Sequence, residues 1–360
     1  MKEVERKLKR LREKMAREKV SALRLRGVDW FAWATGGGDS AVAFNEEAGV
    51  AEVLVTDAGA WILTNRIEAE RIRADEAGGF EVVEFPWESA EPREAFVRTK
   101  AKLVHSDYPK GEEVKLAGSC TELRLTFEPE EVDRYRALGR DAAAALSATL
   151  REANGSMTEA ELAGLAAKAC WGYGIQPILT MAAGAHRLAT YRHPITKAER
   201  LGHRAMIVIC GRRHGLFANV TRHVFWQAMT EEEQKAHAGV LAVESAVFSA
   251  TEEGLSLPEC YARLSEAYRG LNLPAEVHRH HQGGSTGYRT REEVASPESP
   301  PAPRKDGVRA YAWNPSLPGG KIEDTVLRHP DGKLEILTLD PVWPAKEFGK
   351  RLRPEPWVRF

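Results

Sequence analysis

The sequence has few cysteines, no excess of basic residues and no long apolar run, and each shortage excludes a class of protein. Its four cysteines are scattered over 360 residues, so no CxxC pair for a metal or a redox centre exists. The net charge is -1, which argues against a nucleic-acid binder. Apolar runs such as residues 205–210 are too short to span a bilayer, and no secretory signal is evident. We therefore expect a cytoplasmic protein with reduced thiols and neither nucleic-acid nor membrane partners.

Signature motifs of several large enzyme classes are also missing. No G-x-S-x-G elbow and no Walker A motif occur, and residues 36–38 are three glycines without a dinucleotide-binding pattern. The most informative shortage is local: no Asp or Glu lies between Glu199 and Glu231. A carboxylate site that depends on this stretch is therefore excluded.

The first third of the sequence carries the pattern of a small α/β domain. Apolar residues at helical spacing up to Met15 predict an amphipathic first helix. Short β-branched segments predict strands, namely VSALRL, SAVAF, AEVLVTD, AWILTN, FEVVEF and KLVHSDY. Helical stretches fall between some of them, which is typical of a mixed sheet covered by helices.

The rest of the sequence begins with a long helix and continues with helices that have clear start signals. The long helix is predicted to run to about Ala153, and Ser/Thr-x-x-Glu capping boxes at Thr158, Thr230 and Ser256 predict three more. Strands are predicted at residues 204–210 and 216–226, and the proline-rich residues 296–304 at a surface loop. We predict a first domain over residues 1–122, a linker over 123–128 and a second domain over 129–360.

Three stretches of the second domain stand in a familiar order. They read CGRRHGLFANVTRHVF from Cys210, HHQGGSTGY from His280 and WNPSLPGGKIEDTVL from Trp313. Together they resemble the signature segments of the pita-bread superfamily of creatinase and Xaa-Pro peptidases, the M24 type. The resemblance covers nearly the whole chain. It implies an α/β (α+β) fold, with a creatinase-like N-terminal domain followed by a pita-bread domain, and it also implies a homodimer.

The resemblance further implies a dinuclear metal centre, and the sequence departs from it there. In the peptidase branch two aspartates, one histidine and two glutamates hold two divalent metals. The matching positions here are Val208, Asn219, His281, Asn314 and Glu323. One imidazole and one carboxylate do not offset the charge of two divalent ions. We expect a degenerate centre without a cofactor, and a single weakly bound divalent metal at His281, Glu323 and a neighbour stays open.

Other residues of the resemblance suggest how the cleft works. His193, in the segment YRHP, matches a family histidine that contacts the substrate. We predict His193, His281 and Glu323 as catalytic residues, because imidazoles carry protons near neutral pH. The predicted substrate-binding residues are Asn219, Arg222, Tyr288, Asn314 and Lys321. For Arg222 a structural ion pair is an equal alternative, and Lys321 and Arg222 are the cations expected to take the place of a metal.

Three functions are compatible with these residues. The first is a metal-independent hydrolase of C–N bonds, for which creatinase is the family precedent, acting on a small peptide-like or amino-acid-like substrate. The second is a non-catalytic pseudo-peptidase that binds a ligand or a protein partner. The third is an Xaa-Pro dipeptidase with an atypical metal site.

Overall fold

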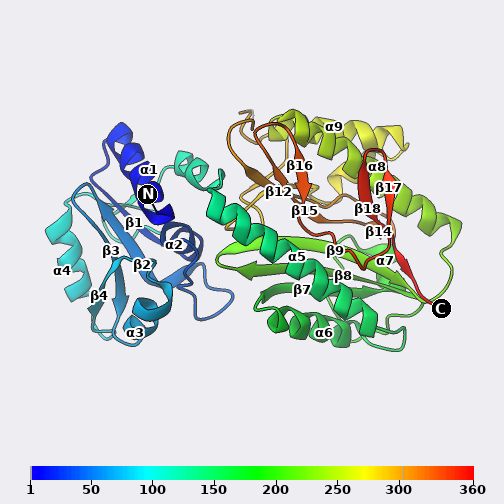
Figure 1. Ribbon diagram of the computed structural model, residues 1–360, viewed down its shortest axis with the longest axis horizontal. Coiled ribbons are helices and arrows are strands. Elements are labelled where there is room, and N and C mark those ends of the chain that lie inside the picture. The colour runs from blue at the N-terminus through cyan, green and yellow to red at the C-terminus, as the bar shows by residue number, and fades with distance from the viewer. Residues whose placement is uncertain (1, 303) are drawn as a thin grey trace. The chain divides into compact units, whose positions relative to one another are not determined.

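The computed structural model describes residues 2–302 and 304–360. These residues divide into two units (Figure 1). The first unit reaches to Glu131 and includes His214–Leu216, and the second comprises Val132–Arg213 and Phe217–Phe360. None of the helices in the described part of the chain is both long enough and apolar enough to cross a membrane.

The first unit is a six-stranded mixed sheet with helices. The strand order is β4-β3-β2-β1-β5-β6, in which β1 pairs antiparallel with β2 and parallel with β5. The strands are β1 (Ala22–Gly27), β2 (Ala48–Thr56), β3 (Ala60–Asn65), β4 (Glu81–Phe85), β5 (His105–Ser106) and β6 (Val114–Lys115). The helices are α1 (Glu3–Glu18), α2 (Val28–Thr35), α3 (Ala69–Arg71), η1 (Ile72–Glu76), α4 (Glu91–Lys100) and η2 (Gly118–Arg124).

One of the predicted strands in this unit is wrong. The segment SAVAF does not form a strand, and residues 40–44 run as a loop. The backbone N–H groups of Val42 and Ala43 donate to the Glu46 carboxylate, which closes a turn instead of a strand ladder. Val42 and Phe44 are exposed, so their side chains do not pack on a neighbouring strand, which is what favours β-branched and aromatic residues in strands.

The second unit contains two larger sheets. The four-stranded sheet has the order β19-β9-β8-β7, and the five-stranded sheet has the order β11-β10-β12-β15-β16. The strands of the first are β7 (Gln176–Gly184), β8 (Arg204–Arg213), β9 (Leu216–Phe225) and β19 (Trp357–Val358), and those of the second are β10 (Gly283–Thr286), β11 (Glu293–Val294), β12 (Arg309–Trp313), β15 (Asp324–Arg328) and β16 (Leu334–Ile336). Two short hairpins pair β13 (Ser316–Leu317) with β14 (Gly320–Lys321) and β17 (Ala345–Phe348) with β18 (Arg351–Pro354). A bridge between Thr221 and Glu323 joins the two sheets.

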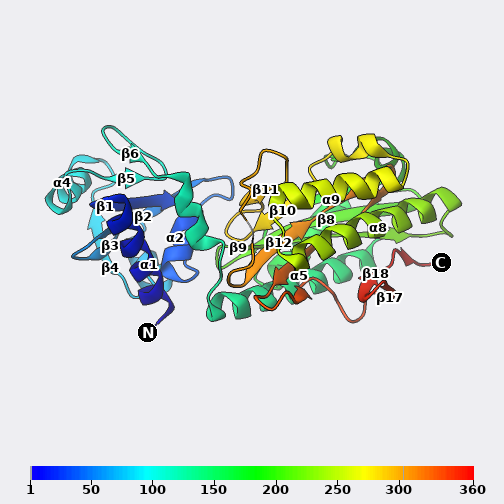
Figure 2. The ribbon, with the colours of Figure 1, turned by 90° about the horizontal axis from the view of Figure 1, so that it is seen from above.

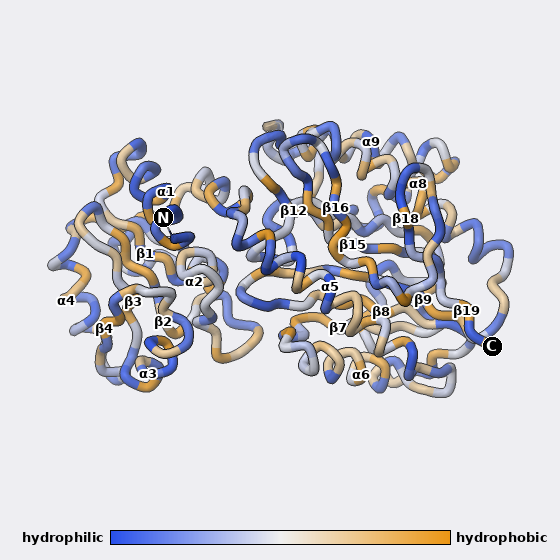
Figure 3. Tube along the Cα trace, in the orientation of Figure 1, coloured by the Kyte–Doolittle hydropathy of each residue, from blue (hydrophilic) through white to orange (hydrophobic). Residues whose placement is uncertain are grey.

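Helices cover both sheets of the second unit. The long helix is α5 (Pro129–Glu152), and the others are α6 (Glu159–Gly172), α7 (Ala185–Thr190), α8 (Glu231–Glu253), α9 (Leu257–Gly270) and η3 (Pro274–His278). Figures 1 and 2 show α8 and α9 side by side, and their apolar faces share a core with Tyr311, Trp313 and Val326 of the five-stranded sheet. In Figure 3 apolar residues concentrate along strands such as β2 and β3, whereas the β17–β18 hairpin is largely hydrophilic.

Helix starts follow the predicted capping signals. Thr158, Thr230 and Ser256 are the N-caps of α6, α8 and α9, and each closes a capping box with the glutamate three residues later. These boxes satisfy backbone N–H groups that the first helical turn leaves unpaired. The predicted proline-rich loop has no helix or strand at residues 296–302 and 304, while its residue 303 lies outside the described residues.

Two glycines fix the position of the loop that carries His281, one of the predicted catalytic residues. Gly283 and Gly284 have φ angles of 112° and 159° and form the start of β10, between β11 and β12. A Cβ atom at Gly283 would lie 2.2 Å from the Ala312 carbonyl oxygen, and one at Gly284 would lie 2.1 Å from that of Glu293. Only glycine fits between these backbones, so the loop that precedes β10 enters the sheet at a fixed point.

Candidate functional site

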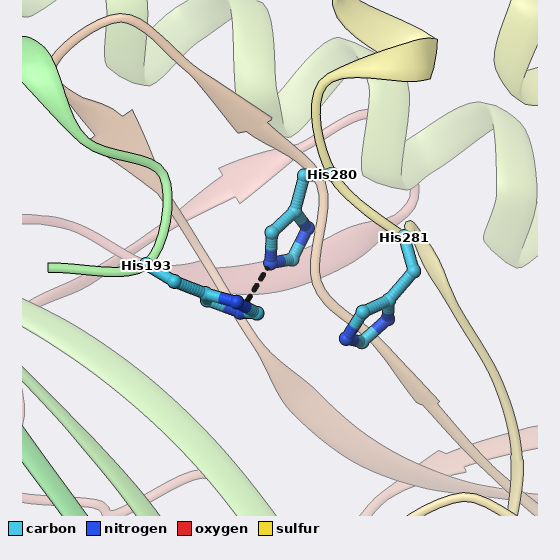
Figure 4. Close-up of side chains that lie close together, drawn as sticks. All are labelled: His193, His280 and His281. Atoms are coloured by element: carbon cyan, nitrogen blue, oxygen red, sulfur yellow. Dashed lines mark hydrogen bonds between the residues drawn. The ribbon is translucent and has the colours of Figure 1, made fainter. Parts of the chain in front are cut away.

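Three histidines from two separate segments meet in the second unit. His193 lies in the loop after α7, and His280 and His281 lie in the loop before β10 (Figure 4). The Nε2 atoms of His193 and His280 are 2.7 Å apart, and the His280 and His281 rings stack with centroids 4.6 Å apart. One nitrogen of each of the three rings lies within 4.8 Å of the others. We call these three residues the imidazole cluster.

A lysine lies directly behind this cluster. The Nζ atom of Lys321, on β14, is 3.3 Å from His280 Nε2. Lys321 is buried, and among the described residues it forms no ion pair with a carboxylate. Since one lone pair on His280 Nε2 faces both Lys321 and His193, the three groups form one hydrogen-bonded chain.

A cavity of about 440 Å³ opens beside the imidazole cluster. All three histidines line it, together with Thr190, Tyr191, Arg192 and Arg279. Arg192 and Arg279 both approach the carboxylate of Glu276, at 2.7 and 3.5 Å. The wall of the cavity is therefore rich in imidazole and guanidinium groups, and it is large enough for a ligand of a few residues at most.

Burial and neighbouring cations keep the imidazoles neutral. Burial and then the Arg291 charge lower the pKa of His281 to about 4, while burial and then Lys321 lower the pKa of His193. Burial and Lys321 also place the pKa of His280 far below its ordinary value. The pKa of Lys321 is itself lowered, chiefly by burial. A neutral imidazole can accept a proton or bind a metal ion.

Glu323 is occupied on both carboxylate oxygens by groups of its own chain. Arg291 Nη2 donates to Oε1 at 2.6 Å, and Thr221 Oγ1 donates to Oε2 at 3.0 Å. Burial alone would raise the pKa of Glu323, but Arg291 and Lys321 hold it below its ordinary value. The site thus holds Glu323 as an anion between two cations.

The other positions that match metal ligands are neutral or apolar. Val208 is buried in an apolar cluster with Met181, Ala183, Leu188, Met206 and Cys210. Asn219 is fully buried, and its Nδ2 lies 3.4 Å from Thr286 Oγ1 while its Oδ1 has no partner. Asn314 Oδ1 also has no partner, although its backbone N–H donates to the Gln282 carbonyl. At these three positions the two amide oxygens are the only acceptor side-chain atoms, because Val208 has none.

These residues do not fit the dinuclear centre of the family. Such a centre needs several carboxylates to offset two dications and to set their spacing. The one carboxylate present, Glu323, is already paired with Arg291, and Lys321 adds a further positive charge.

Two predicted substrate-binding residues do not join the imidazole cluster. The Arg222 guanidinium lies on the other face of β9, where Nη2 donates to Asp324 Oδ1 at 2.7 Å and to the Thr338 carbonyl at 2.8 Å. This geometry favours the structural ion pair. Tyr288 has only 2% of its surface exposed, so its side chain does not face the open cavity. Trp313 lies in the apolar core and stacks on Tyr311.

Sequence reasoning missed Arg291 and gave no role to His280. Lys321 was one of the two cations expected in the place of a metal, and the structure brings it to the cluster. The second cation there is Arg291 and not Arg222. A buried glutamate requires a counter-charge, which was a usable signal, but nothing in the sequence selects Arg291 from its neighbour Arg289.

Family comparisons agree with this architecture. Residues 133–324 match the model of metallopeptidase family M24, and residues 7–138 match that of the creatinase/prolidase N-terminal domain. The first match covers more than half of the chain. The protein belongs to metallopeptidase family M24 and has the pita-bread fold with a creatinase-type N-terminal domain. No curated protein matches the sequence.

Solved structures share the fold at low sequence identity. A prolidase from Thermococcus sibiricus matches with a TM-score of 0.81 and 15% identity over 100% of both chains. An Xaa-Pro dipeptidase from Bacillus anthracis matches with a TM-score of 0.79 and 16% identity, over 99% of this chain and 100% of that one. The N-terminal domain of the FACT complex subunit SPT16 from chickpea matches with a TM-score of 0.66 and 14% identity, over 89% of this chain and 90% of that one.

Proposed function

We propose that this M24 protein hydrolyses C–N bonds of a small peptide-like or amino-acid-like substrate without the metal pair of its family. The observation that carries the proposal is the ion pair between Arg291 and Glu323 at 2.6 Å, with Lys321 beside it. Glu323, the one carboxylate at a position matched to a family metal ligand, is thus surrounded by the cations Arg291 and Lys321. The imidazole cluster then provides the groups able to move protons.

The proposed reaction is proton transfer through His193. Its imidazole takes a proton from a water molecule whose oxygen bonds to the substrate carbonyl carbon. The same proton passes to the departing nitrogen as the C–N bond breaks. His193 is exposed to the cavity, while His280 Nε2 at 2.7 Å holds its ring in place.

His281 and the cations serve the carbonyl oxygen in this proposal. His281 lines the same cavity and can donate a hydrogen bond to the oxygen that becomes negative. Lys321 and Arg291 carry two positive charges against the one negative charge of Glu323, which stabilises the same oxygen. In this proposal Glu323 accepts the hydrogen bond from Arg291 and does not contact the substrate.

Activity with and without metal tests the proposal. The purified protein is stripped with chelator, its metal content is measured, and hydrolysis of Xaa-Pro dipeptides and other small amides is followed with and without added Mn²⁺. We expect turnover that survives chelation and that falls by about 10²–10⁴-fold in His193→Ala. His186→Ala, which changes a histidine with an 87% exposed side chain, is the matched control and should retain full activity. Turnover that appears only with added Mn²⁺ would instead favour an atypical metal-dependent dipeptidase.

A second candidate is a pseudo-peptidase that binds a ligand or a partner without turnover. The observation that favours it is the shared fold with a domain named as part of the FACT complex. Saturable binding of dipeptides to the cavity, with no hydrolysis under any metal condition, would favour this function over the first. Dimer formation and a cytoplasmic location remain predictions that size measurement and fractionation can test.

A further inference from the structure

We infer that the imidazole cluster is a mononuclear site for a divalent transition metal such as Zn²⁺ or Co²⁺, with ligands distinct from the family's dinuclear centre. The ligands are His193, His280 and His281. Two of them, His193 and His280, are not among the positions matched to the family metal ligands. The inference concerns binding and does not depend on the proposed reaction.

The spacing of the nitrogens suits one ion. Histidine nitrogens bind Zn²⁺ at about 2.0–2.1 Å, which puts the ligand atoms of a tetrahedral site roughly 3.4 Å apart. The observed separations include 2.7 Å between His193 and His280 and reach at most 4.8 Å across the cluster. Figure 4 shows the three rings close together, and the cavity beside His193 and His281 leaves room for the ring rotations that binding of one ion would require.

The donor set selects the kind of metal. Three imidazoles without a carboxylate suit Zn²⁺, Co²⁺, Ni²⁺ and Cu²⁺, whereas Mg²⁺ and Ca²⁺ require oxygen ligands. The neighbouring carboxylate of Glu323 does not complete the set, because Arg291 and Thr221 hold its two oxygens. The cavity leaves a fourth position open to water, as in three-histidine catalytic zinc sites.

Lys321 opposes the metal and sets its affinity. Its Nζ lies 3.3 Å from His280 Nε2, so it faces the same lone pair that a metal would take, and its positive charge repels a dication. Removing this charge should therefore tighten metal binding. This prediction separates a true three-histidine site from nonspecific binding to surface histidines, which Lys321 would not influence.

Metal at this site would also affect the proposed reaction. If His193 carries the proton, a metal on its lone pair blocks transfer, so Zn²⁺ should inhibit chelator-resistant turnover. This consequence rests on the proposed function, whereas the binding itself does not.

Titration of the chelator-treated full-length chain with Co²⁺ tests the site. We expect one Co²⁺ per chain, with visible absorption of a low-symmetry nitrogen-ligated ion, and competition by Zn²⁺. His193→Ala and His281→Ala should each weaken binding by at least about tenfold. Lys321→Met should strengthen it by about tenfold, and His186→Ala should leave it unchanged. For the buried His280 the variants His280→Ala and His280→Gln are compared, with circular dichroism to establish folding.

The outcomes separate the two proposals. Equal Co²⁺ binding in wild type and in the folded His193→Ala and His281→Ala variants, or two ions per chain, overturns the site. The same holds if Lys321→Met leaves the affinity unchanged. If the site binds one ion and the metal-free protein is inactive until Zn²⁺ is added, the site stands and metal-independent hydrolysis falls. If the metal-free protein hydrolyses its substrate and no Co²⁺ site is found, metal-independent hydrolysis stands and the three-histidine site falls.

Discussion

Glu323 and Asp324 are neighbours in the chain, yet they belong to two charge clusters of opposite character. Asp324 accepts from Arg222 at 2.7 Å and from Arg353 at 2.6 Å, and Arg353 also binds Glu244 at 2.6 Å. We call these four residues the Asp324 network. It contains two carboxylates and two guanidinium groups, and burial raises the pKa of Glu244 to about 7. Around Glu323, two cations face one anion, and three imidazoles stand beside them.

The two clusters differ in how many of their buried polar atoms have partners within the chain. The carboxylates and guanidinium groups of the Asp324 network pair with one another, and one of its buried atoms, Arg353 Nη1, has no partner. The surroundings of Glu323 leave several buried polar atoms without a partner, including His280 Nδ1, Asn219 Oδ1 and Asn314 Oδ1. Unpaired buried groups cost stability, and they are retained most often where a ligand or a reaction uses them.

The largest expected effect comes from breaking the Asp324 network. Asp324→Asn should destabilise the protein by about 3–5 kcal/mol, because it leaves Arg222 and Arg353 with an uncompensated buried charge. Urea unfolding measures the change. Co²⁺ binding by whatever fraction stays folded should equal that of the wild type, and a selective loss of metal binding would contradict the separation of the two clusters.

A smaller loss of unfolding free energy is expected when the ion pair between Arg291 and Glu323 is broken. Arg291→Gln removes the charge-assisted hydrogen bond to Glu323 and should cost about 1.5–3 kcal/mol in unfolding free energy. Because Lys321 remains nearby, the loss should be smaller than that of Asp324→Asn. A control is Arg140→Gln, which changes a 69% exposed arginine whose surface ion pair with Asp141 should contribute little. Equal losses of unfolding free energy for Arg291→Gln and Asp324→Asn would contradict the proposed difference between the two charge clusters.

The smallest expected effect is a pH dependence of the unfolding free energy that comes from His223 on β9. Burial and then the charge of Arg204 lower the pKa of His223 to about 3, with His237 and Lys321 also facing it. The folded state therefore rejects a proton that the unfolded state accepts below pH 6.5. Stability from this group is fully present above pH 6.5, falls as the pH drops and levels off near pH 3.

The His223 contribution can be measured by substitution. Between pH 6.5 and 5.5 the loss of stability from His223 should amount to about 1 kcal/mol, and His223→Gln should abolish it. Unfolding in urea at several pH values, for wild type and variant, gives the difference in slope. His186→Gln should keep the wild-type slope, and an unchanged slope in His223→Gln would show that His223 takes up a proton in the folded state.

Much of the fold could be predicted because local signals agree with it. The capping boxes at Thr158, Thr230 and Ser256 act within one helical turn, so sequence alone places those helix starts. The SAVAF segment shows the limit of such signals. Its β-branched pattern suits a strand, but a strand needs a partner, and the turn closed by Glu46 leaves it none.

The sequence by itself determined the family frame and the lack of carboxylates at the metal positions, because both depend on which residue stands at which place. Only the tertiary structure decided which cation pairs with Glu323 and that His280 joins His193. Arg222 and Arg291 are equally good partners in sequence, but alternation along β9 turns Arg222 toward Asp324 and leaves Glu323 to Arg291. Charge pairing across a fold depends on distance in space, and distance along the chain does not determine it.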